Sequence, residues 1–148
     1  MRSDRRGFTL IELIVVVSII GLLASIAVPR YSVLKQRAIV ASMISDLRNL
    51  LTAQEAFISA HGDYAGGITG GNEIPGTGGA GRAALQLSDG VQLQLNYRSN
   101  PATGEGWSAV ATHPAVTDPS TNECGIFVGA PAYSPSVDVT VPGAIVCY

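Results

Sequence analysis

The chain has 148 residues, which bounds it to one domain: once an N-terminal apolar segment is set aside, about 90 to 115 residues remain to form a core. Hydrophobic residues make up 47% of the chain and charged residues 14%, and the apolar excess is concentrated before residue 30. Residues 61–148 carry two bases against seven acids, a net charge of −5, so this part repels nucleic acid and anionic lipid. Direct nucleic-acid binding by it in general is not expected, and a local patch around Arg82 or Arg98 is the one alternative.

The first element is an apolar run from Phe8 to Val28, which Pro29 and Arg30 close. Its 21 residues would form a helix of roughly 30 Å at about 1.5 Å per residue, the thickness of the hydrocarbon core of a bilayer. By the positive-inside rule, the three arginines before the run predict a cytoplasmic N-terminus with the rest of the chain outside; they are Arg2, Arg5 and Arg6. The run contains one acid, Glu12, which a purely apolar span does not require.

Two ordinary interpretations of this run leave Glu12 unexplained. The first is a cleaved secretory signal, with Ser25-Ile26-Ala27 as the cleavage site and a loose twin-arginine pattern at Arg5-Arg6. The run, however, is longer than the roughly 7 to 15 apolar residues of a signal. The second is an uncleaved single-pass anchor, which explains the length but not the acid, because a carboxylate at mid-bilayer depth costs about 2.5 to 3.5 kcal/mol and generally faces a partner.

The stretch Gly7-Phe8-Thr9-Leu10-Ile11-Glu12, with a short basic leader before it and the apolar run after it, closely resembles the class III leader of type IV pilins and of type II secretion pseudopilins. The resemblance implies that residues 1–7 are a leader, that prepilin peptidase cuts after Gly7, and that it N-methylates Phe8. Residues 8–29 would then form the transmembrane and filament-core helix. The resemblance also implies that Glu12 of an incoming subunit neutralises the Phe8 amine of a preceding one, which sets the register of helices in a filament.

The helix is predicted to continue past Pro29 as an amphipathic half over residues 30–61. Apolar residues recur there at spacings of three or four and give a stripe that must cover something: Ile39, Met43, Leu47, Leu50 or Leu51, and Phe57 or Ile58. Gly62 is a fitting stop after His61. Because Gly21 and Pro29 both weaken local helix, a kink or a locally extended stretch is predicted between them.

Residues 62–90 are predicted to be a glycine-rich αβ loop, because nine glycines fall between positions 62 and 81 and no Gly-Lys-Ser/Thr ending makes them a phosphate loop. Residues 91–148 are predicted to form a β-sheet head. Apolar patterns indicate strands at 91–97, 107–112 and 125–128, and a fourth over 137–141 and 144–147 that Pro142-Gly143 breaks. The predicted fold class is α+β, a long N-terminal helix packed on a four-stranded antiparallel sheet, which resembles the pilin head in organisation.

The two cysteines, Cys124 and Cys147, lie in the final quarter of a part expected to be exported, where an even count suggests one disulfide. The alternative is two buried free thiols. A disulfide closing a loop of that length would stabilise the head by about 3 kcal/mol in the chain-entropy model, a useful amount for so small a core.

No catalytic or metal-binding pattern stands out in the sequence. His61 and His113 are the only histidines, and neither is spaced with a cysteine or a second histidine as metal ligands require, so both are interpreted as structural. Asp118, Asn122 and Glu123 form an oxygen-rich turn of a kind that can hold calcium, but loops commonly carry such residues and no metal site is predicted. We therefore expect no enzyme activity and no cofactor.

Two functions fit such a chain. A pilin would polymerise through its N-terminal helix into a surface filament for adhesion, twitching motility or DNA uptake, whereas a pseudopilin would build a periplasmic piston for protein export. The glycine-rich loop, the terminal disulfide loop and the lack of a clear calcium site favour the pilin. A soluble exported binding protein released after Ala27 is a third alternative.

The resemblance also implies partners and a location. The expected partners are identical or homologous subunits in a helical homopolymer, prepilin peptidase, the inner-membrane assembly platform and, before assembly, the membrane itself. The chain would pass from the bacterial inner membrane into an extracellular pilus, with its head on the periplasmic or extracellular side.

Overall fold

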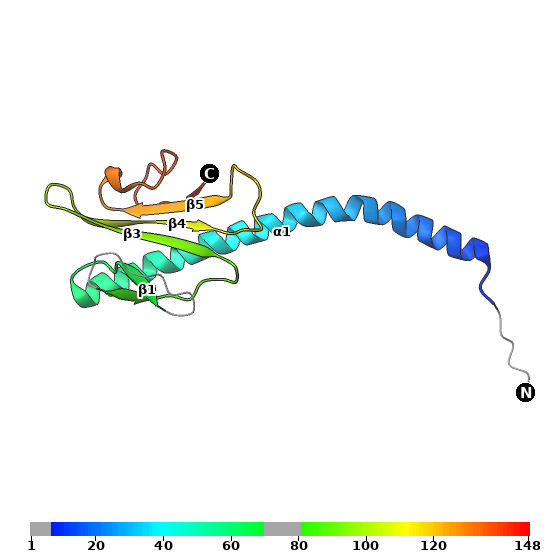
Figure 1. Cartoon of the computed structure of the whole chain (residues 1–148), viewed down its shortest axis with the longest axis horizontal. Helices are drawn as coiled ribbons and strands as arrows, with labels where there is room; N and C mark the ends of the chain where they lie inside the picture. Colours follow the sequence, from blue (N-terminus) through cyan, green and yellow to red (C-terminus); the bar gives the residue numbers. More distant parts are fainter. Residues whose placement is uncertain (1–6, 70–80) are drawn as a thin grey trace, which may run out of the picture. The chain divides into compact units, whose positions relative to one another are not determined.

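The computed structural model describes residues 7–69 and 81–148, and the chain divides into two units, of which the first ends at Lys35 and the second is Gln36–Tyr148. One helix, α1, runs from Leu10 to His61 and belongs to both units (Figure 1). Every described residue of the first unit is exposed, and the second unit holds the hydrophobic core. Packing of the head is therefore confined to the second unit, to which α1 contributes its C-terminal half.

The end of α1 lies where the sequence predicts it. Gly62 has a φ of 80°, in the left-handed region, and its N–H donates to the carbonyl of Ile58 at 2.8 Å, so the helix stops after His61. Gly21 and Pro29 both lie inside α1, and residues 21–29 are helical throughout. The prediction of a locally extended stretch is thus wrong, whereas a kink at Gly21 and Pro29 stays a prediction.

The predicted α+β fold with a four-stranded antiparallel sheet is confirmed. The strands, in the spatial order β3-β4-β5-β6, are Gln92–Asn100, Gly104–Thr112, Glu123–Val128 and Val146–Cys147. The first three are longer than predicted, and for β3 and β4 the reason is a three-residue turn that keeps their polar residues in register. In that turn Thr103 N–H donates to the carbonyl of Asn100 at 3.2 Å, and Gly104 takes the left-handed φ of 83° that such a hairpin requires.

The fourth predicted strand is wrong over residues 137–141. A short 3-10 helix, η1 (Pro131–Tyr133), precedes this segment, residues 137–141 themselves make turns and irregular structure, and the strand paired with β5 is Val146–Cys147. The hydroxyl of Ser134 donates to the carbonyls of Ser136 and Val139, both at 2.6 Å. These local bonds occupy carbonyls that a strand would offer to its neighbour, so the alternating valines build no ladder.

Two short strands lie inside the segment predicted to be a loop. β1 (Gly67–Thr69) and β2 (Arg82–Ala84) pair in parallel, with Ile68 opposite Ala83, and both of these central residues are buried. Three-residue strands beside glycines carry too little alternation to be detected in a sequence. Positions 70–80 of the predicted loop lie outside the described residues.

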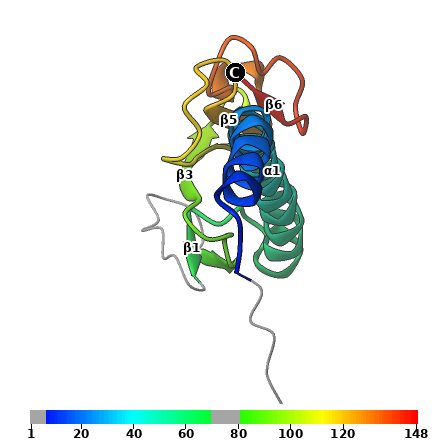
Figure 2. The same cartoon turned by 90° about the vertical axis from the view of Figure 1, so that its right-hand side faces the viewer.

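The main core lies between α1 and one face of the sheet. Met43, Leu47 and Leu50 of α1 are fully buried and pack with inward side chains of β3, β4 and β5; these are Leu93, Leu95, Trp107, Ala109, Ala111, Cys124 and Ile126. Figure 1 shows the cyan part of α1 running beside β4, and in Figure 2 β3 lies to one side of the teal part of α1. The apolar stripe predicted for residues 30–61 therefore covers the sheet.

Gln54 ties α1 to the chain just before β1. Its side chain is fully buried, its Nε2 donates to the carbonyl of Ala65, and its Oε1 accepts from the N–H of Ala65, both at 2.9 Å. We expect Gln54→Ala to lower the free energy of unfolding by about 2 to 4 kcal/mol, because two buried backbone groups lose their partner. Denaturant unfolding of the detergent-solubilised chain measures this, with the exposed Asn49→Ala as control; equal stability of the two variants would contradict it.

Candidate functional site

The N-terminal end of α1 carries an acid that its own chain holds in place. Thr9 stands immediately before the first helical residue, and its hydroxyl oxygen accepts a hydrogen bond from the N–H of Glu12 at 3.3 Å. The carboxylate of Glu12 accepts bonds from the N–H and the hydroxyl of Thr9, at 2.8 and 2.7 Å. This reciprocal arrangement is a capping box, which satisfies orphan N–H groups at the helix start and orients the carboxylate.

Thr9 is the residue of this site that the sequence interpretation missed as a partner of Glu12. A threonine followed three positions later by glutamate, before an apolar run, is the sequence signature of a capping box, and Thr9-Leu10-Ile11-Glu12 matches it. These four residues are also the centre of the leader motif. One short stretch therefore both starts the helix and positions its acid.

The described residues of the first unit present an exposed apolar surface. Its large apolar side chains, Phe8 and Leu10 among them, are exposed. An 18-residue window of α1 has a mean hydropathy of 2.7 with none of it buried, so α1 is long and apolar enough to cross a membrane by length and composition. An isolated soluble protein rarely exposes a surface of this extent, which indicates that lipid or neighbouring helices cover it.

Glu12 lies in a shallow hollow of this surface. The hollow has a volume of about 340 Å³ and is lined by Phe8, Ile11, Glu12, Val15 and Val16. These residues recur at helical spacings and so occupy one face of the segment. The hollow is apolar, and Glu12 is the one charged residue among those that line it.

In the second unit, Asp63, Tyr97 and Glu105 form an acidic cluster beyond the end of α1. The carboxylate of Asp63 accepts hydrogen bonds from the N–H of Tyr64 at 2.6 Å and from the hydroxyl of Tyr97 at 3.3 Å. A hydrogen bond to Asp63, which only a protonated carboxyl can donate, raises the pKa of Glu105, and desolvation and the charge of Asp63 act in the same direction. The cluster is a local acid pair, and the part of the chain that the structure describes adds no third metal-ligating residue to it.

We expect Glu105→Gln to raise the Tm at pH 7 by about 1 to 2 °C, a small shift because Glu105 is exposed. A carboxyl whose pKa is raised by folding makes the protein less stable as the pH rises through that pKa, and the cost is absent in acid. The gain in Tm should therefore vanish below pH 4.5, because 4.5 is the ordinary pKa of this carboxyl group. Thermal unfolding at both pH values checks this, with the exposed Asp89→Asn as control; a gain that persists in acid would refute it.

The other sequence candidates occupy structural positions. The Nδ1 atom of His61 lies 3.1 Å from the carbonyl oxygen of Phe57, and Nδ1 of His113 accepts a backbone N–H of its own turn at 3.0 Å. Asp118 accepts bonds from the N–H and hydroxyl of Ser120, at 3.0 and 2.7 Å, and these bonds lower the pKa of Asp118. No group of three metal-ligating residues occurs within residues 7–69 and 81–148.

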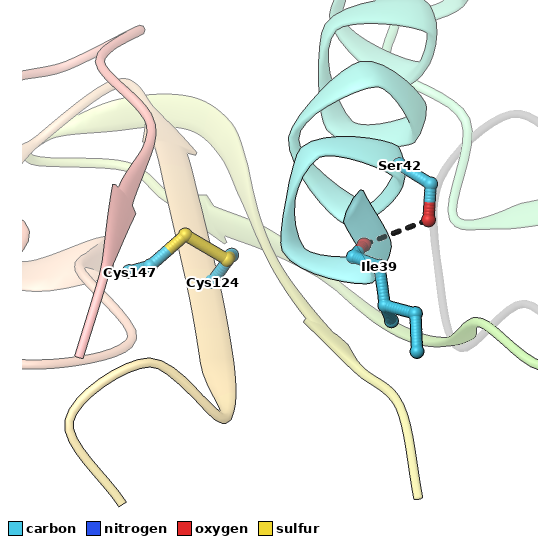
Figure 3. The surroundings of a disulfide bond; sticks show 4 residues. All are labelled: Ile39, Ser42, Cys124 and Cys147. Carbon is cyan, nitrogen blue, oxygen red and sulfur yellow. Dashed lines mark hydrogen bonds between the residues drawn. A yellow bond between two sulfur atoms is a disulfide. The ribbon is translucent and has the colours of Figure 1, made fainter. Parts of the chain in front are cut away.

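A disulfide joins Cys124 of β5 to Cys147 of β6 (Figure 3). The two residues face each other in the ladder, with Cα atoms 3.9 Å apart, and neither thiol is free. Figure 3 also shows Ile39 and Ser42 of α1 near this bond, and Ile39 packs against the core cluster that contains Cys124. The disulfide therefore attaches the two-residue strand β6 to the core.

The same N-terminal segment is similar to known proteins. Residues 2–28 match the family model of the prokaryotic N-terminal methylation motif. The type IV major fimbrial protein FimA of Dichelobacter nodosus is 36% identical over 116 residues, an alignment that covers 76% of this chain and 73% of FimA. The chain belongs to the type IV pilin family.

Two further relatives are similar to this pilin over shorter stretches. The type IV major pilin protein PilA of Myxococcus xanthus is 45% identical over 60 residues, which cover 40% of this pilin and 27% of PilA. A fimbrial protein of Pseudomonas aeruginosa is 36% identical over 93 residues, which cover 57% of this pilin and 60% of that protein. No solved structure is significantly similar. The methylation motif spans Gly7, Phe8 and Glu12, whose roles in cleavage, methylation and assembly stay predictions.

Proposed function

We propose that this pilin is the repeating structural subunit of a type IV pilus whose filament is held together by the N-terminal helices. The observation that carries the proposal is the uncovered apolar helix with one oriented carboxylate, Glu12, in its first turn. Family membership supports a helical homopolymer, and the N-terminal methylation motif supports processing by prepilin peptidase. The chain has no catalytic role in this proposal, and the inner-membrane assembly platform adds subunits to the growing fibre.

Cleavage after Gly7 leaves the amine of Phe8 four residues before Glu12. That separation is about one turn of helix, so a neighbouring helix displaced by roughly that amount brings its own Glu12 beside this amine. A charge left unpaired in apolar surroundings is costly, and only the register that pairs amine with carboxylate avoids the cost. Before assembly, the two bonds from Thr9 supply Glu12 with donors, so the acid is not bare in the membrane.

The proposal assigns a place to each segment of the chain. Residues 1–7 are a cleaved leader, 8–29 cross the inner membrane and later form the filament core, and 30–61 are the amphipathic half-helix. The loop over 62–90 and the sheet and disulfide loop over 91–148 form the head, outside the inner membrane before assembly and on the extracellular filament after it. The filament would serve adhesion, twitching motility or DNA uptake.

Electron microscopy of fibres sheared from intact cells, with peptide identification of their subunit, tests this function. We expect surface fibres composed of this chain. If the chain is instead found only in the cell envelope while secretion of folded enzymes fails in its absence, the pseudopilin alternative is correct. That outcome would contradict the proposal that this chain forms a surface pilus.

A further inference from the structure

β3 is the long edge strand of the head sheet (Figure 1), and its outer edge has no partner within the described residues. It pairs only with β4, in a continuous register from Gln92↔Thr112 to Asn100↔Gly104. Apart from the turn bond at Asn100, none of the described backbone groups outside β4 bonds to the backbone of this strand. The outward-facing N–H and C=O groups of this nine-residue strand thus have no backbone partner among residues 7–69 and 81–148, and such a row is a template for another strand.

Within the part of the chain that the structure describes, β3 has few of the devices that protect edge strands from pairing. It contains no proline, its register with β4 has no bulge, and its one charged residue is Arg98. Leu93 and Leu95 point into the core, whereas the opposite face of the strand carries amide side chains at Gln92, Gln94, Asn96 and Asn100. Uncharged amides and an open main chain suit strand addition, because both hydrogen-bond without charge repulsion.

We propose that the outer edge of β3 binds β3 of a second copy of this pilin, antiparallel and two-fold symmetric about Asn96. The strand is complementary to itself in this arrangement, with Gln94 opposite Arg98 and Asn96 opposite its own counterpart. Like charges face each other nowhere along the pair, and paired side chains stay on the same face of the joined sheet. This self-complementarity is what selects a second copy over an unrelated peptide.

The contact joins two fibres, and it therefore rests on the proposed pilus. Subunits within a helical filament make head-to-tail contacts, which are not two-fold symmetric, so a two-fold contact must link subunits of different filaments. Each fibre repeats the β3 edge along its length. Even if a single contact is weak, the total affinity between two fibres is high, because the second and later contacts between the same two fibres form at high effective concentration. The expected result is lateral bundling of fibres.

Charge substitutions at Gln94 test the register of this contact. Gln94 and Arg98 are both exposed, so the substitutions leave the core intact. We expect Gln94→Lys, which faces Arg98 of the other copy, to lower the fraction of sheared fibres pelleted at low speed at least tenfold, and Gln94→Glu to raise it. Combining Gln94→Lys with Arg98→Glu should restore bundling. The matched control is Gln86→Lys, an exposed position outside β3.

Cysteine cross-linking tests the symmetry axis. In Asn96→Cys fibres the two thiols face each other, within the Cα separation of less than about 7 Å that a disulfide needs, so non-reducing gels should show a pilin dimer. In Gln92→Cys fibres the like thiols lie about 27 Å apart at roughly 3.4 Å per residue, and no dimer is expected. If fibres form normally but their bundling does not respond to the Gln94 substitutions and Asn96→Cys gives no dimer, the proposed contact is wrong. The proposed pilus function would still stand. A cross-link to a different protein would overturn the second copy as partner.

Discussion

Fibres are expected to be lost when Glu12 is replaced by alanine, although the chain is still inserted and processed. Removing one partner of a charge pair in apolar surroundings costs about 3 to 5 kcal/mol, because the other charge is left bare. That corresponds to a loss of roughly 10² to 5 × 10³-fold in the affinity with which a subunit joins the filament. Immunoblots of sheared-fibre and membrane fractions measure the effect.

The matched control for this prediction is Ser18→Ala. Ser18 is an exposed polar residue of the same helix, and its hydroxyl donates to its own helix at the carbonyl of Ile14, at 2.8 Å, so its loss removes no predicted pairing between subunits. We expect Ser18→Ala to leave fibre yield near that of the native chain. Normal fibres from the processed and inserted Glu12→Ala chain would show that Glu12 does not set the filament register.

Loss of the disulfide is expected to destabilise the head by about 3 kcal/mol in the double variant Cys124→Ala, Cys147→Ala. The bond spans 23 residues of sequence, and opening that loop returns entropy to the unfolded chain. In the native state the C-terminal segment is held to β5 by the two ladder residues of β6 and by backbone bonds of Tyr148 with Glu123 and of Gly143 with Phe127. A second small cluster, of Phe127, Tyr133 and Val139, packs beneath the same C-terminal segment and should loosen with it.

Thermal and denaturant unfolding of the full chain in detergent checks the disulfide prediction. Val137→Ala is the control, since Val137 lies inside the loop but is 91% exposed and should change stability by less than about 0.5 kcal/mol. Reduction of the native chain should reproduce the midpoint of the double variant. A double variant as stable as the Val137→Ala chain would show that noncovalent contacts alone hold the C-terminal segment in place.

The elements that the sequence predicts well are those set by local chemistry over many residues. The amphipathic stripe of α1 and its stop at Gly62 follow from periodicity and from the left-handed preference of glycine. Residues 137–141 escape such prediction, because two hydrogen bonds from Ser134 override an alternating pattern. The short strands β1 and β2 depend on tertiary pairing alone, and no local signal marks them.

Some features of the candidate site can likewise be predicted from the sequence, and others cannot. Gly7, Phe8 and Glu12 are readable from one motif, and so is the Thr9 cap, since all of its bonds lie within four residues. The open edge of β3 is not readable, because alternation identifies a strand without giving its place in the sheet. The pairing of Glu12 with a neighbouring amine likewise belongs to an assembly of chains.

Mass spectrometry of the mature N-terminus, on subunits taken from sheared fibres, is the most direct test of the proposed subunit. We predict a chain that begins at Phe8 and carries one methyl group on its amine. A chain that begins at Val28, or one that keeps residues 1–7, would contradict processing at the leader and with it the pairing of Glu12 in the filament.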